Sequence, residues 1–142
     1  MLFRSHLAGI WVIIIDDEQD AREMVKVVLQ QWGAKVTALG TVPEVIDALA
    51  GESEGGRPDV LVADIAMPEE DGFDLIRKVR RLGPERGGAI PAIALTAYAS
   101  REDRLRVLSE GYQVHVAKPM SLVELATVVK RLVKNHKEGL IV

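Results

Sequence analysis

The sequence predicts an α/β fold in which a parallel sheet is covered by helices on both faces, and three observations lead to this prediction. Five short apolar runs alternate along the chain with five stretches of helical periodicity, the pattern of a parallel sheet with crossover helices. Three of the runs are almost entirely apolar, as expected for strands buried on both faces. The length of 142 residues suits one domain with its own core.

The first strand is predicted at residues 10–15, where every side chain is apolar. Residues 60–63 and 90–95 have the same character and are predicted to be central strands. Residues 34–39 and 112–117 mix polar with apolar side chains, which is typical of strands near the edge of a sheet. The strand order 2-1-3-4-5 places these two at the edges, and it is the order of the flavodoxin-like doubly wound fold.

The helices are predicted from apolar spacing and from capping patterns. The first helix has an apolar face with the spacing i, i+4, i+7 and i+11, formed by Ala21, Val25, Val28 and Trp32. The last helix has a similar face, formed by Leu122, Leu125, Val129 and Leu132. Two pairs have the spacing of a capping box that opens a helix, Thr41 with Glu44 and Ser121 with Glu124. Shorter helices are predicted over residues 72–82 and 100–109.

We expect the folded domain to span residues 9–135, with tails over 1–8 and 136–142. The chain has no cysteine, which excludes disulfides and thiolate chemistry and fits a reducing cytoplasm. No apolar run is long enough to cross a bilayer, so we expect a cytoplasmic protein without membrane contact. The net charge of −3 argues against nucleic-acid binding, and basic residues such as Arg80 and Arg81 are expected on solvated helix faces.

Polar side chains follow four of the five predicted strands, and together they form the candidate site. They are Asp16 and Asp17 after the first strand, Asp64 after the third, Thr96 after the fourth and Lys118 after the fifth. In a doubly wound fold the ligand lies beyond the carboxyl ends of the strands, at the switch point between strands 1 and 3. The second strand ends in Leu39-Gly40 and adds no polar side chain.

The three carboxylates of this site would repel one another, because like charges at close range disfavour ionisation. A divalent cation would relieve the repulsion, and oxygen ligands without His or Cys favour Mg²⁺, with Mn²⁺ as a substitute. Mg²⁺ in proteins is usually held by one or two carboxylates and a phosphate, so the site suits a phosphoryl group that Thr96 and Lys118 would hold. No glycine-rich loop follows the first strand, which counts against a flavin or nucleotide cofactor.

Each of these residues also has an ordinary structural interpretation. The acids after the first strand would be favourable near the positive end of a helix, and Asp64 could cap a turn. Thr96 could be one more β-branched strand residue, and Lys118 a solvated loop residue. The coincidence of all of them at the carboxyl ends of four strands favours the chemical interpretation.

Four motifs make the sequence similar to the receiver domains of response regulators and hybrid sensor histidine kinases. They are Ile15-Asp16-Asp17-Glu18, Asp64-Ile65-Ala66-Met67-Pro68-Glu69-Glu70-Asp71-Gly72, Leu95-Thr96-Ala97 and Val116-Ala117-Lys118-Pro119. The resemblance runs over residues 9–133, and it is strongest to receivers attached to hybrid kinases in residues 91–99 and 111–119. It implies a two-component phosphorelay in which the chain accepts a phosphoryl group from a histidine kinase or a histidine phosphotransfer domain. Such a receiver catalyses only its own phosphorylation and dephosphorylation.

The resemblance assigns the phosphoacceptor and metal roles by position. Asp64 matches the aspartate that takes the phosphoryl group. Asp17 matches the direct Mg²⁺ ligand, and Asp16 an acid that acts through metal-bound water. The backbone carbonyl of Ala66 matches a further metal ligand.

The remaining motifs match residues that surround the phosphoryl group. Thr96 and Lys118 match the residues that hold its oxygens, and the peptide bond before Pro119 matches one that is cis in this family. Gly72 matches the entry to the third helix, where a glycine permits a turn that other residues resist.

The resemblance also implies a switch and a means of tuning it. Thr96 matches one half of the family's switch, and His115 stands where the other half is often Tyr or Phe. The switch would act on the surface formed by the helix at 100–109, the strand at 112–117 and the last helix, through which a homodimer is also expected. Ala66 and Tyr98 occupy positions that tune the lifetime of the phosphoryl group.

Two other functions use a similar set of residues. A phosphatase of the haloacid dehalogenase type needs a second Asp two residues after the nucleophile, and here that residue is Ala66. A binding module that works without phosphorylation usually lacks one of the acids or the lysine, and here all are present. A small phosphodonor with Mg²⁺ separates the three, because only a receiver gains one stable adduct.

Overall fold

A computed structural model describes residues 6–51, 56–97, 100–118 and 121–139. These contain five parallel strands in the order β2-β1-β3-β4-β5, so the predicted fold class and strand order are confirmed. The strands are β1 (Trp11–Ile15), β2 (Lys35–Leu39), β3 (Val60–Asp64), β4 (Ala92–Thr96) and β5 (Val114–Ala117). The helices are α1 (Gln19–Gln31), α2 (Val42–Ala50), α3 (Gly72–Arg80), α4 (Arg101–Glu110) and α5 (Leu122–Lys137), with a short 3₁₀ helix η2 (Pro84–Arg86).

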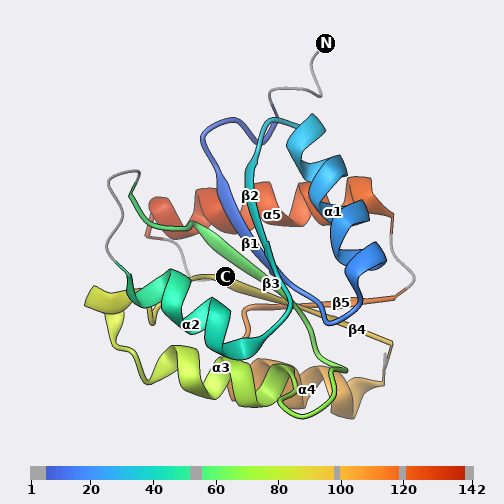
Figure 1. Cartoon of the computed structure of the whole chain (residues 1–142), viewed down its shortest axis with the longest axis vertical. Coiled ribbons are helices and arrows are strands. Elements are labelled where there is room, and N and C mark those ends of the chain that lie inside the picture. Colours follow the sequence, from blue (N-terminus) through green and yellow to red (C-terminus); the bar gives the residue numbers. More distant parts are fainter. Residues whose placement is uncertain (1–5, 52–55, 98–99, 119–120, 140–142) are drawn as a thin grey trace.

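The sheet is covered on both faces, with α1 and α5 on one side and α2, α3 and α4 on the other (Figure 1). Alternate residues of β1 point into the two layers: Ile14 packs with the α1/α5 side, and Ile13 with the α2/α3 side. All residues of β3 and β4 are buried. The ends of these two strands therefore carry Asp64 and Thr96 into buried positions.

The helix starts follow the capping patterns. The Thr41 hydroxyl accepts a hydrogen bond from the Glu44 N–H, and the Ser121 hydroxyl one from the Glu124 N–H, as predicted. A full capping box, which was not predicted, opens α3: the Asp71 carboxylate accepts from the Phe73 and Asp74 N–H groups, and the Asp74 carboxylate accepts from the Asp71 N–H. The N-cap hydrogen bonds stabilise the first turns of α2, α3 and α5.

β4 and β5 begin later than the sequence predicts, at Ala92 and Val114. Before β5 the chain turns Tyr112 into the core, where its hydroxyl donates to the Gly72 carbonyl at 2.7 Å. Burial raises the pKa of this phenol well above its usual value, so it stays a hydrogen-bond donor. Tyr112 is therefore an anchor between the start of α3 and the start of β5.

The amino end of the sheet is tied together by Arg80, at the end of α3. Its guanidinium donates to the carbonyls of Gly88, Ile90 and Gly111 at 2.6–3.1 Å, and to the Gln113 side chain. Burial lowers the pKa of this group. The expectation that Arg80 lies on a solvated helix face is thus wrong, whereas its neighbour Arg81 is exposed.

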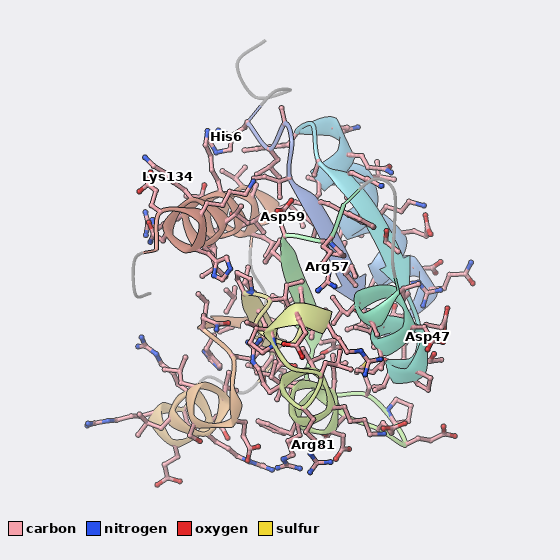
Figure 2. The ribbon with its side chains drawn as sticks, turned by 90° about the vertical axis from the view of Figure 1, so that its left-hand side faces the viewer. His6, Asp47, Arg57, Asp59, Arg81 and Lys134 are labelled. Carbon is pink, nitrogen blue, oxygen red and sulfur yellow. The ribbon has the colours of Figure 1, made fainter. Side chains whose placement is uncertain are left out.

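A second polar link at the amino end joins β1 to the start of β3. The Asp59 carboxylate accepts from the Trp11 N–H at 2.8 Å, and the Lys137 ammonium lies 3.7 Å from its other oxygen. Figure 2 looks onto this end of the sheet, with Asp59 and Arg57 beside the start of β3 and Arg81 directly after α3. No helix among the described residues is both long and apolar enough to span a bilayer.

Candidate functional site

Three carboxylates converge at the carboxyl end of the sheet. Asp64 is the last residue of β3, and Asp16 directly follows β1. Ile15 lies beside Ala63 in the register of these neighbouring strands. The residues that follow them, Asp16 and Asp64, therefore also lie side by side. One oxygen from each of Asp16, Asp17 and Asp64 lies within 4.8 Å of the others. The structure therefore brings together the three acids expected from the sequence.

The surroundings of Asp16 disfavour its ionised form. Asp16 and Asp64 are only 8% and 6% exposed, whereas Asp17 is exposed. Burial raises the pKa of Asp16, and the charges on Asp64 and Asp17 raise it further against the opposing hydrogen bond from the Glu18 N–H. A divalent cation bound here would favour the ionised form of Asp16.

The donor set fits a hard divalent cation. All of the clustered side-chain donors are carboxylate oxygens, the ligands preferred by Mg²⁺. The Ala66 N–H donates to Asp64 Oδ1 at 3.2 Å, so the backbone of Ala66 runs beside the cluster. The carbonyl of the same residue is the further metal ligand expected from the sequence.

Positive charge reaches the cluster from β5. Lys118 Nζ lies 3.2 Å from Asp64 Oδ1. The Lys118 N–H donates to the Thr96 carbonyl at 2.7 Å, which fixes the base of the lysine against the end of β4. Thr96 itself is 2% exposed. The ammonium and the end of β4 thus lie on one side of Asp64, opposite β1 in the strand order.

Position 72 requires glycine because there is no room for a side chain, and not because the backbone adopts a conformation that only glycine favours. Its φ is not in the left-handed region, which in this loop is occupied by Glu69 at φ 65°. A Cβ on Gly72 would lie 2.6 Å from Ile65 Cδ1 and 2.8 Å from Ile65 Cα. The expectation that Gly72 permits an unusual turn is therefore wrong. The absence of a side chain lets α3 approach the chain immediately after Asp64.

The other expected residues lie around this centre or outside the described part of the chain. His115 is half-buried in β5 opposite Ala94. It lies between Val114 and Val116, which pack on the α1/α5 side, so its side chain points toward the α4 side. Ala66 is exposed beside the cluster. Tyr98 and Pro119 lie outside the described residues, so the roles expected of them stay predictions.

One residue near the cluster was missed. The Arg22 guanidinium, in the first turns of α1, donates to the Asp16 carbonyl at 2.8 Å. The sequence signal was an arginine six residues after Asp16, on the helix that follows the acids. Nothing local in the sequence indicated that this arginine turns back toward the strand.

Comparison with known proteins identifies the family. Residues 12–130 match the model of the response regulator receiver domain. The chain belongs to this family. As a receiver domain it is a module of two-component signalling, and receiver domains bind Mg²⁺ at an acidic site and interact with histidine kinases or phosphotransfer domains.

Similar proteins differ in how much of their own length this chain covers. The chain is 40% identical over 125 residues to an uncharacterised 14.6 kDa protein of Leptolyngbya boryana, covering 88% of this chain and 91% of that protein. It is 32% identical to hybrid signal transduction histidine kinase D of Dictyostelium discoideum, over 94% of this chain but only 9% of that protein. A solved structure of a sensor histidine kinase receiver from Pseudomonas aeruginosa, with magnesium coordinated in its active site cleft, is 27% identical with a TM-score of 0.76, covering 89% and 99% of the two chains.

Proposed function

We propose that this receiver domain accepts a phosphoryl group onto Asp64 from the phosphohistidine of a histidine kinase or phosphotransfer domain. Mg²⁺, or Mn²⁺ in its place, would be held by Asp16, Asp17, Asp64 and the Ala66 carbonyl. The observation that carries the proposal is the convergence of three carboxylates, with the Lys118 ammonium 3.2 Å from Asp64. The metal supplies charge neutralisation for the incoming group.

In the proposed reaction a carboxylate oxygen of Asp64 attacks phosphorus and the N–P bond breaks. The phosphoimidazole, protonated on its other ring nitrogen, keeps the electron pair of that bond and leaves as neutral imidazole. The Ala66 N–H and Lys118 both contact Asp64 Oδ1, and these contacts orient the carboxylate. Lys118 then balances the charge on the phosphoryl oxygens, and the Thr96 hydroxyl donates to one of them. Phosphoryl transfer requires mainly such positioning and charge stabilisation.

The output we propose runs through Thr96 and His115 to the surface of α4, β5 and α5. Thr96 and His115 lie on the neighbouring strands β4 and β5, so movement of the threonine toward the phosphoryl group would change the space beside the histidine. We also propose that two copies of the domain pair through this surface and that the protein works in the cytoplasm. Ala66 and Tyr98 are proposed to tune the lifetime of the phosphoryl group. Two states with different partner affinity are required for such a switch.

The proposal is tested by intact-mass measurement after treatment with acetyl phosphate and Mg²⁺. Wild type should gain one phosphoryl group, and Asp64→Asn should gain none. Asp47→Asn, an exposed aspartate on α2, is the matched control and should be labelled as wild type is. Continuous turnover of acetyl phosphate without an adduct would indicate a phosphatase. The absence of both adduct and turnover would indicate a binding module.

A further inference from the structure

The three acids of the cluster are held in different ways. The Asp16 carboxylate accepts from the Glu18 N–H at 2.9 Å, and Asp64 from the Ala66 N–H at 3.2 Å. Asp17 is exposed, and among the described residues none donates a hydrogen bond to its carboxylate. The direction in which the Asp17 side chain points therefore depends on the backbone from which it projects.

That backbone is fixed from two sides. Arg22 Nη1 donates to the Asp16 carbonyl at 2.8 Å, and the Asp16 N–H donates to the Leu39 carbonyl at 3.2 Å. The Asp16 carbonyl and the Asp17 N–H belong to one planar peptide group. Holding the carbonyl therefore fixes the orientation of the peptide that enters Asp17.

Gly40 leaves the space in which the Arg22 guanidinium lies. A Cβ on Gly40 would come 2.8 Å from Arg22 Nη1 and 3.6 Å from its Cζ, and the three nearest heavy atoms all belong to Arg22. The φ of Gly40 is not in the left-handed region, so alanine is conformationally acceptable there. The end of β2, which offers no polar side chain, thus contributes to the site by leaving room for an arginine.

We propose that Arg22 is a positioning residue for Asp17, the direct Mg²⁺ ligand of the proposed function on which this inference rests, and that Gly40 is required to seat it. The role is one of geometry and not of charge. A cation beside the acidic cluster repels Mg²⁺, so a purely electrostatic effect of removing Arg22 would tighten metal binding. Loss of positioning would weaken metal binding. The two explanations therefore predict opposite changes in Mg²⁺ affinity when Arg22 is replaced.

The test is calorimetric titration of Mg²⁺ at fixed ionic strength into wild type, R22Q, G40A and the double variant R22Q/G40A. R22Q and G40A should each weaken binding by about three- to tenfold, the effect of one lost hydrogen bond. The double variant should bind no more weakly than R22Q, because both changes break the same contact. R22K, which keeps a donor and the charge, should recover part of the affinity.

The matched control is R81Q, which removes the same charge from an exposed position at the far end of α3 and should bind Mg²⁺ as wild type does. A metal-free readout accompanies the titration: amide hydrogen exchange at Glu18, whose N–H donates to Asp16 Oδ1, should accelerate in R22Q and G40A but not in R81Q. If R22Q does not fold, the Mg²⁺ affinities and amide exchange rates of R22K and G40A are compared with those of wild type instead.

Tighter binding by R22Q, or wild-type affinity and wild-type amide exchange in both single variants, would overturn the positioning role while leaving the metal site intact. Lower thermal stability with unchanged Mg²⁺ affinity would also overturn it, because Arg22 would then only link α1 to β1. Failure of wild type itself to bind Mg²⁺ would instead contradict the proposed function.

Discussion

The two ends of the sheet use charged residues in opposite ways. At the amino end, Arg80 is surrounded by carbonyl oxygens, and Asp59 by a backbone N–H and the Lys137 ammonium. At the carboxyl end, Asp16, Asp17 and Asp64 carry the same charge within 4.8 Å. The charged groups at the amino end hold the fold together. At the carboxyl end, Lys118 lies 3.2 Å from Asp64 and balances only part of the repulsion among the acids until a divalent cation binds. Stability and phosphorylation should therefore respond separately to substitutions at the two ends.

The largest expected effect is on stability, from Arg80→Met at the amino end. The substitution keeps a long apolar side chain but leaves three backbone carbonyls without their donor. It should lower the free energy of unfolding by about 2–4 kcal/mol, measured by urea denaturation. Phosphorylation of the folded fraction should be unchanged.

The matched control for Arg80 is its exposed neighbour. Arg81→Met should change the free energy of unfolding by less than about 0.5 kcal/mol. Equal losses in the two variants would show that the guanidinium contacts of Arg80 do not stabilise the amino end.

A substitution at Gly72 should affect stability and phosphorylation together, since this residue touches the chain next to Asp64. Gly72→Ala would force its Cβ against Ile65, and such overpacking should lower the free energy of unfolding by about 1–3 kcal/mol. The displaced Ile65 should also slow phosphorylation by acetyl phosphate. If stability falls but the phosphorylation rate stays that of wild type, the added methyl group displaces α3 and leaves the strand that carries Asp64 in place.

A smaller effect, and one of opposite sign, is expected from Asp16→Asn at the carboxyl end. The amide oxygen can still accept from the Glu18 N–H while the repulsion disappears, so metal-free protein should gain about 0.5–1 kcal/mol in denaturation experiments, after allowance for solvent screening. Mg²⁺ should stabilise wild type more than the variant and thus reduce the difference. The exposed control Asp20→Asn should show no comparable gain.

The same reasoning gives a pH dependence. Because burial raises the pKa of Asp16 above its ordinary 3.8, the native state binds more protons than the unfolded state in the window just above that value. The contribution of Asp16 to the stability of the metal-free protein should therefore fall as the pH rises through this window. The fall should be smaller in Asp16→Asn, and an identical pH profile in the two proteins would contradict the electrostatic account of the cluster.

The sequence predicted the fold and the acidic cluster because both depend on local patterns. Apolar runs mark the strands, and parallel strands bring their carboxyl ends together, so acids that follow them must meet. Arg80, Arg22 and Tyr112 were not assigned their roles, since each contacts residues that only the tertiary fold brings near. Arg80 and Arg81 look alike in the sequence, and only the packing of the fold makes Arg80 half-buried and leaves Arg81 exposed.

The central claim, that Asp64 takes the phosphoryl group, is tested most directly by locating the adduct. Protein treated with acetyl phosphate and Mg²⁺ is reduced with borohydride, which converts an aspartyl phosphate into homoserine, and is then sequenced by tandem mass spectrometry. The account predicts homoserine at position 64 alone. Homoserine at Asp16 or Asp17, or a phosphoryl group retained on a hydroxyl or imidazole side chain, would contradict it.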